Sequence, residues 1–204
     1  MKIVSPSFEI FSFTPDLEKV IERAGRTCYK SEGKITDTSY KDLIARLKAS
    51  KHESVLEHGA ITVRIVCDRG VSHELVRHRI VSFSQESTRY CNYSKDKFGS
   101  EITVIRPCYF TDDVAKRDEW RTACEAAERS YFVLLGQGAT PQEARSVLPN
   151  SLKTEIVMTA NPREWMWIFE KRCDQTAHPS MREIMIPMRE AFRAMWPSIF
   201  GQPA

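Results

Sequence analysis

The stretch Gly59-Ala-Ile-Thr-Val-Arg-Ile-Val-Cys67 alternates apolar with polar side chains. In a β-strand, successive side chains point to opposite faces of the sheet, so a period of two predicts a strand with one buried face. This is the clearest strand signal in the chain. We therefore expect the fold to be organised around a sheet that contains this segment.

The residues before this strand predict one more strand and two helices. Residues 2–13 alternate loosely and indicate an edge strand broken near Pro6, because proline cannot donate to a strand ladder. Thr14-Pro15-Asp16 has the composition of a helix start, with a capping side chain, a first-turn proline and an early acid. We expect helices over about residues 14–29 and 38–49.

The residues after the strand predict a short helix over 71–78, a strand over 102–105 and a long helix over 112–135. Apolar residues recur at helical spacing along the long helix, which indicates that one of its faces packs on a core. The inner face is expected to carry Val114, Trp120, Ala123, Ala127, Tyr131 and Leu134.

The last part of the chain carries three further helix starts. Thr140-Pro141-Gln142-Glu143 begins a short helix that Pro149 stops, Asn161-Pro162 begins another, and His178-Pro179 begins the last. A strand is expected over 151–160.

Helices and strands interleave without a regular repeat, so the predicted class is α+β. We expect a single domain over residues 1–204, with a central antiparallel or mixed sheet flanked by helices.

The bulk composition is that of a soluble globular protein, with 42% apolar and 28% charged residues among 204. No apolar run is long enough for a membrane span or a signal peptide, so a cytoplasmic protein is expected. A net charge of +3 is too small for a general nucleic-acid coat. The six cysteines contain no Cys-x-x-Cys pair and the five histidines no i, i+4 pair, so no metal site is predicted.

The segment Arg77-His-Arg-Ile-Val-Ser-Phe-Ser-Gln-Glu-Ser-Thr-Arg-Tyr90 gathers three arginines with several hydroxyl side chains. Guanidinium forks and hydroxyls together bind phosphate or carboxylate oxygens, so this segment predicts an anion pocket. Alternatively, Glu74 to Arg79 is helical and its basic residues offset the helix dipole, which accounts for Arg77 and Arg79 only. The residues of this segment after Arg79 are too polar for a core strand.

Nucleotide-binding motifs rich in glycine are missing from the sequence, which contains neither Gly-x-Gly-x-x-Gly after a strand nor a Walker loop. If a nucleotide binds, arginines must hold it. Arg145 and Arg172 are two further candidates, although either could be a solvated helix residue.

Arg77-His78-Arg79, followed after seven residues by Ser87 and then by Arg89-Tyr90, resembles the signature of the flavin-dependent thymidylate synthases. Anchors outside the signature extend the resemblance over about residues 50–185. These anchors are His52-Glu53 with Glu57-His58, Ala144-Arg145 with Leu148-Pro149, Asn161 with Arg163, and Arg172 five residues before Ala177.

The resemblance implies a homotetramer with active sites shared between subunits, which binds no membrane and no nucleic acid. It implies that dTMP is made from dUMP with methylenetetrahydrofolate as carbon donor and FADH2, regenerated by NADPH, as hydride donor. The implied FAD contacts are His52, Ser54, Arg77, His78, Arg79, Gln85, Asn161, Arg163 and Trp167. The implied dUMP contacts are Glu74, Arg77, Gln85, Glu86, Ser87, Thr88, Arg89, Arg145 and Arg172.

The resemblance also assigns the catalytic role to Arg172, whose fixed cation would favour ionisation of the pyrimidine N3 and raise the electron density at C5. No protein nucleophile is then needed. The sequence departs from many relatives at Ser84-Gln85, where they have Asn-Glu, and at His178-Pro179-Ser180, where they have Gln-Trp-Glu.

Two other functions are compatible with parts of the sequence. One is a non-catalytic nucleotide- or RNA-binding protein that uses the same arginines with Tyr90, Tyr93 and Phe98 as stacking platforms. The other is a metal-dependent nucleotide hydrolase built on the histidines.

Overall fold

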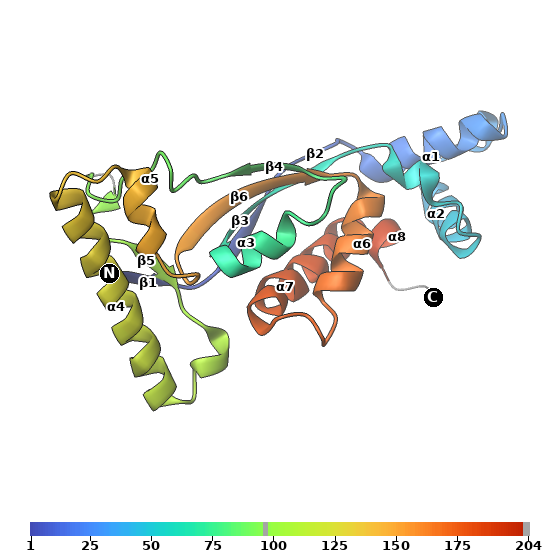
Figure 1. Ribbon diagram of the computed structural model, residues 1–204. Coiled ribbons are helices and arrows are strands. Elements are labelled where there is room, and N and C mark those ends of the chain that lie inside the picture. The colour runs from blue at the N-terminus through green and yellow to red at the C-terminus, as the bar shows by residue number, and fades with distance from the viewer. Residues whose placement is uncertain (96–97, 202–204) are drawn as a thin grey trace. The chain divides into compact units, whose positions relative to one another are not determined.

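The computed structural model describes residues 1–95 and 98–201 (Figure 1). Within it the chain divides into two compact units. Unit 1 comprises Met1–Ser7, Ile65–Arg77 and Phe83–Val157, and unit 2 comprises Phe8–Arg64, His78–Ser82 and the residues from Met158 onwards. The single domain expected from the sequence stays a prediction, because contacts within one chain do not measure how cooperatively it unfolds.

The strands form two sheets. In the smaller sheet, β1 (Lys2–Val4) pairs in parallel with β5 (Thr103–Ile105). The larger sheet has the order β2 (Ser7–Phe13), β3 (Ile61–Asp68), β6 (Lys153–Ala160), β4 (Ser82–Gln85). Val104 and Leu152 add an antiparallel bridge. The predicted α+β class, with an antiparallel or mixed sheet flanked by helices, is confirmed.

Several strand predictions are confirmed by the burial of alternate residues. Every second residue of β3 and of β6 is buried, as a strand with one inner face requires. The break near Pro6 separates β1 from β2, and β2 lies at the edge of its sheet. The segment judged too polar for a core strand nevertheless contains β4, which is also an edge strand and is not fully buried.

The first helices of unit 2 begin later than predicted. Helix α1 spans Leu17–Cys28 and follows Asp16, because the Thr14 hydroxyl accepts a hydrogen bond from Ala60 N (3.0 Å) instead of capping the helix. Helix α2 (Tyr40–Ala49) packs against α1. Short 3-10 turns follow each helix, η1 at Glu32–Lys34 and η2 at Glu53–Glu57.

The helix that precedes the arginine-rich segment ends earlier than predicted. Helix α3 spans Arg69–Leu75, and Asp68 caps it by accepting a hydrogen bond from Val71 N (2.7 Å). Arg77 and Arg79 lie beyond its last turn and are exposed. Their interpretation as helix-dipole partners is therefore wrong.

The core of unit 1 lies against α4 (Val114–Gly136), which packs on α5 (Pro141–Ala144) and on the 3-10 turn η5 (Arg145–Val147) (Figure 1). Another 3-10 turn, η4 (Cys108–Phe110), precedes α4. The predicted inner face is wrong in part, because Val114 and Ala123 are exposed. Cys124 takes the inner position beside Ala123 and Tyr131 is fully buried, as predicted. The buried members of this core are Tyr93, Ile102, Val104, Cys124, Tyr131, Ala144 and Leu152.

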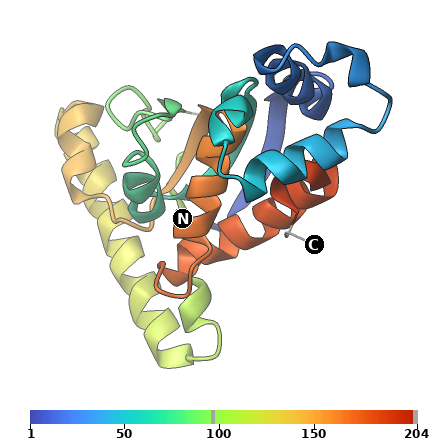
Figure 2. The same ribbon diagram turned by 90° about the vertical axis from the view of Figure 1, so that its right-hand side faces the viewer.

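The C-terminal helices of unit 2 are α6 (Pro162–Arg172), α7 (Pro179–Met195) and α8 (Pro197–Phe200). Helix α6 packs on α7, and α2 packs on α8 (Figure 2). Aromatic rings fill the space between them, with Phe192 in contact with Trp165, Phe169, Trp196 and Phe200 at centroid distances of 5.0–5.2 Å. Among the described residues, no helix is long and apolar enough to cross a membrane.

Candidate active site

The residues predicted to bind ligands are distributed over both units. The predicted dUMP contacts, except Arg172, belong to unit 1, and the predicted FAD contacts, except Arg77 and Gln85, belong to unit 2. The arginine-rich signature itself is divided after Arg77 and again after Ser82. Each group of residues is described below within its own unit.

Helix α6 positions three of the predicted residues in unit 2. It begins with Pro162, and Asn161 caps it by accepting a hydrogen bond from Glu164 N (2.8 Å). Arg163 and Trp167, four residues apart, project from the same side of the helix, whereas Arg172 is rotated by about 180° from Arg163 at 100° per residue. The helix therefore presents two separate sets of functional groups.

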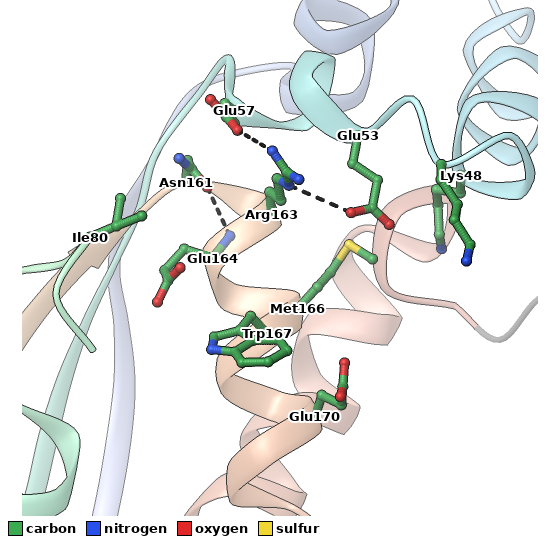
Figure 3. A pocket seen from close by; sticks show the side chains of 11 residues that line it. Lys48, Glu53, Glu57, Ile80, Asn161, Arg163, Glu164, Met166, Trp167 and Glu170 are labelled. Carbon is green, nitrogen blue, oxygen red and sulfur yellow. Dashed lines mark hydrogen bonds and ion pairs between the residues drawn. The ribbon is translucent and has the colours of Figure 1, made fainter. Parts of the chain in front are cut away.

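The side of α6 that carries Arg163 and Trp167 borders a cavity of about 940 Å³ (Figure 3). Arg163 Nη1 lies 2.6 Å from Glu57 Oε1, and its Nε lies 3.5 Å from Glu53 Oε2. The Trp167 indole is 49% exposed. The lining residues are Lys48, Lys51, Glu53, Glu57, Ile80, Asn161, Arg163, Glu164, Met166, Trp167 and Glu170.

On another side of α6, the half-buried Arg172 and the buried His78 form a polar pair. Arg172 Nε donates to His78 Nε2 (3.0 Å), and His78 Nδ1 faces Glu164 Oε1 at 3.5 Å. Burial and the Arg172 charge lower the pKa of His78 to about 4, while burial raises the pKa of Glu164. His78 is therefore neutral at pH 7, with its proton on Nδ1, because Nε2 accepts from Arg172.

Glu164 is a residue of the candidate site that sequence reasoning missed. Asn161-Pro162-Arg163-Glu164 has the pattern of a helix start, in which an acid in the first turn needs no further explanation. The helix start alone was therefore enough to explain a glutamate at this position, and nothing in the sequence marked it as part of a site. The structure shows that this carboxyl group faces His78.

In unit 1, Gln85 lies in a buried hydrogen-bond network. Its Nε2 donates to Ser72 Oγ (2.9 Å) and to Thr154 Oγ1 (3.2 Å). Ser72 Oγ in turn donates to the Arg69 carbonyl (3.0 Å), so the hydroxyl must accept from Gln85. The Gln85 amide nitrogen is thus used by the protein, and its role as a ligand contact stays a prediction.

Glu86 also has protein partners for both carboxylate oxygens. Oε1 accepts from Tyr93 Oη (3.1 Å), and Oε2 lies 3.0 Å from Lys153 Nζ. Burial and the Glu86 charge raise the pKa of Tyr93, which therefore stays protonated and donates. Each oxygen retains a second lone pair, so a contact of dUMP with this carboxylate stays a prediction.

The turn that follows β4 carries Thr88 and Arg89. Arg145, at the start of η5, lies close to this turn. Arg145 Nη1 approaches Thr88 Oγ1 at 3.4 Å, and Arg89 Nε donates to Gln142 Oε1 (3.0 Å). The Ser87 carbonyl accepts from Tyr90 N and Cys91 N at 3.1 and 2.9 Å and closes the turn. Within unit 1 the structure thus brings Thr88, near the end of the signature, together with Arg145, although they are far apart in sequence.

The other predicted contacts in unit 2 lie outside the large cavity. His52 precedes η2 and borders a second cavity of about 410 Å³ with Arg26, Lys34 and Arg46. Ser54 lies in η2, and Arg79 is exposed. Their roles as FAD contacts stay predictions.

Possible metal ligands and two buried thiols bear on the chemistry available to the chain. Among the described residues, no group of three or more His, Cys, Asp or Glu side chains could hold a metal ion. Burial raises the pKa of Cys67 and raises that of Cys124 to about 11. Both thiols are therefore protonated at pH 7 and poor nucleophiles.

Comparison with known proteins places this arrangement in context. The family model described as thymidylate synthase complementing protein matches residues 9–198. The flavin-dependent thymidylate synthase of Geobacter sulfurreducens is 32% identical over 94% of this chain and 84% of its own length. The flavin-dependent thymidylate synthase of Nitratidesulfovibrio vulgaris is 30% identical over 98% of this chain and 88% of its own length.

The fold itself has a solved counterpart. The crystal structure of the UMP/dUMP methylase PolB from Streptomyces cacaoi, bound with 5-Br dUMP, superposes with a TM-score of 0.81 over 98% of this chain and 95% of that one. The sequence identity is 23%, so this likeness concerns the fold.

Proposed function

Because the chain belongs to the thymidylate synthase complementing protein family, we propose that it makes dTMP by reductive methylation of dUMP. Methylenetetrahydrofolate would donate the carbon, and NADPH would regenerate the reduced FAD. When bound, reduced FAD supplies the hydride that completes the methyl group. A homotetramer with shared active sites is part of the proposal and is supported by the resemblance of the signature.

The large cavity of unit 2 fits a substantial part of FAD. Its volume of about 940 Å³ lies at the upper end of the range for ligand pockets, about 300–1,000 Å³. The half-exposed Trp167 ring offers an apolar face to a flavin or adenine ring, and Arg163 with Lys51 would hold the pyrophosphate. Because Arg163 is paired with Glu57 and Glu53, the pyrophosphate would share this guanidinium with them.

The bond between Arg172 and His78 is the observation that carries the proposal. A neutral imidazole accepts the Nε proton of Arg172 and fixes the plane of the guanidinium without adding a second positive charge. A cation fixed in this way at the pyrimidine would favour ionisation of N3 and raise the electron density at C5. C5 could then attack the carbon donor without first being activated by a protein nucleophile, in agreement with the high pKa of the buried thiols.

The first test is spectroscopic. The purified protein, supplied with FAD, is expected to be yellow, and NADPH added without oxygen should bleach the flavin band faster when dUMP is present. Formation of dTMP on addition of methylenetetrahydrofolate completes the test. A colourless protein that takes up no FAD would contradict the proposal and favour a non-catalytic nucleotide- or RNA-binding protein.

The Arg172→Ala variant separates substrate activation from flavin binding. It is expected to keep its flavin and to lose dTMP formation by about 100-fold or more, the usual effect of removing one preorganised charge. The exposed Arg129→Ala on α4 is the matched control and should keep both properties. An Arg172→Ala enzyme with unchanged turnover would refute the assigned role.

A further inference from the structure

Arg69, which no sequence motif singled out, has a buried polar atom without a partner. Its Nη1 is buried and makes no hydrogen bond to any residue that the structure describes. Buried donors are nearly always satisfied in native proteins, so an unpartnered one requires an explanation. Arg69 lines a cavity of about 260 Å³ in unit 1.

This cavity is cationic. Arg69, His73 and Arg145 line it together with the polar side chains of Thr88, Ser146 and Asn150. Among the described residues that line it, none is acidic. This differs from the large cavity of unit 2, where four glutamates accompany the cations. The small cavity therefore suits an anion better than any neutral group.

The main chain of Arg69 is held on both sides. Its N–H donates to the Asn150 carbonyl (2.9 Å), and its own carbonyl accepts from Ser72 Oγ, which is bound by Gln85. Thr88, at 6% exposure, adds a hydroxyl that Arg145 Nη1 approaches at 3.4 Å. The backbone from which the Arg69 side chain projects is therefore fixed, which favours a preformed site.

The size of the cavity restricts the ligand. About 260 Å³ lies below the usual range for a whole drug-sized molecule, about 300–1,000 Å³. It accommodates a phosphate group with part of its sugar, and it is too small for a dinucleotide. Two guanidinium groups and two hydroxyls match the oxygens of a phosphate monoester.

We propose that Arg69 is a phosphate-binding residue, which together with Arg145 and Thr88 holds the 5′-phosphate of dUMP. The inference rests on the proposed function for the identity of the nucleotide. It adds to that function a reason for selecting the nucleotide over the nucleoside. A nucleoside without phosphate would leave the Arg69 Nη1 unpartnered in its buried position.

The test compares the affinities for dUMP and deoxyuridine by titration calorimetry on the FAD-loaded protein. Arg69→Gln is expected to weaken dUMP binding about 10- to 100-fold, the range for one charged hydrogen-bonding group, and to leave deoxyuridine binding unchanged. Inorganic phosphate should compete with dUMP in the wild type and should need about 10- to 100-fold higher concentrations to bind the variant. Arg129→Gln, the same charge change at an exposed site of unit 1, should behave as wild type.

A second variant guards against a purely structural effect. Arg69→Met keeps most of the side-chain volume and removes the unpartnered buried donor, so the ligand-free protein should have an unchanged or higher Tm while losing its preference for dUMP over deoxyuridine. Equal losses for both ligands with a lower Tm would show a structural role and overturn the inference.

The remaining outcomes separate the two proposals. A wild type that forms dTMP, with an Arg69→Gln variant that keeps the full preference for dUMP, overturns the role of Arg69 alone. A wild type that binds neither dUMP nor deoxyuridine overturns both the proposed function and the inference.

Discussion

Burial and a neighbouring cation act on His78 in the same direction. Both disfavour the imidazolium, so the side chain is neutral over the whole physiological range and serves as an acceptor for Arg172. The spacing of His78 between two arginines in sequence does not determine its charge state. The neutral state follows from burial and from its contacts with residues of α6, which lie far away along the chain.

The depressed pKa of His78 has a consequence for stability. Between about pH 4 and the ordinary histidine pKa of 6.5, the unfolded chain takes up a proton and the folded chain does not. Stability is therefore lost as the pH falls through this window, by about 2 kcal/mol at pH 5, and His78 contributes no pH dependence above 6.5. Urea unfolding at pH 7 and pH 5 should show this loss in the wild type and a smaller one in His78→Gln.

The exposed substitution Val133→Ala, which removes no titratable group, is the control for this measurement and should keep the pH dependence of the wild type. An identical loss of stability in His78→Gln and wild type would show that the protonation of other groups causes it.

Gln85 illustrates how hydrogen-bond direction selects a side chain. A glutamate here would have no N–H to donate, and Ser72 Oγ could donate to it only by releasing the Arg69 carbonyl. Gln85→Glu is therefore expected to lower the free energy of unfolding by about 1–3 kcal/mol, measured in urea. In the control Gln142→Glu, the changed side chain accepts from Arg89, so stability should be unchanged or higher. A Gln85→Glu protein as stable as wild type would contradict this assignment of the network.

At the scale of elements, helix starts were predicted better than helix faces. Asn161 caps α6 and Thr140 with Glu143 forms a capping box at α5, both as expected from local chemistry. The inner face of α4 was misassigned at Ala123, which is exposed beside the buried Cys124. A small apolar residue such as alanine does not indicate which face of a helix is buried, because it is tolerated on either face.

Asn161 can be tested for two roles, as a cap and as a flavin contact. Asn161→Ala should cost about 1 kcal/mol of stability, the usual value of a cap, whereas Asn161→Asp should keep the cap. If the amide group also contacts FAD, Asn161→Asp should lose flavin while its urea midpoint stays near that of wild type. Full flavin content in Asn161→Asp would leave the residue with its capping role only.

At the scale of the whole molecule, the two units have separate cores. Tyr131 is fully buried in the core of unit 1, and Phe192 is fully buried among the aromatic rings of unit 2. Truncation of either ring to alanine is expected to cost about 3–5 kcal/mol. If the chain is one cooperative domain, as predicted, Tyr131→Ala and Phe192→Ala will each shift a single urea transition seen by both fluorescence and circular dichroism.

Two transitions, with each variant shifting only one of them, would contradict the single domain. The exposed substitution Val133→Ala on α4 serves as a control and should leave the unfolding curve nearly unchanged.

Local chemistry in the sequence was sufficient for much of this protein. Alternation of side chains identified β3 and β6, caps and prolines identified the starts of α5, α6 and α7, and the spacing of Arg77, His78, Arg79 and Ser87 indicated the family that the comparisons confirm. These features depend on residues a few positions apart, whose interactions are set by the backbone geometry of a helix, strand or turn.

Tertiary structure alone decided how the functional groups are paired. The neutral state of His78, its bond to Arg172, its contact with Glu164 and the unpartnered Nη1 of Arg69 all depend on residues brought together from distant segments. Charge state and hydrogen-bond direction follow from burial and from such neighbours, and neither is determined by sequence spacing. The sequence therefore indicated which residues are chemically important, and the fold determined what each of them contacts.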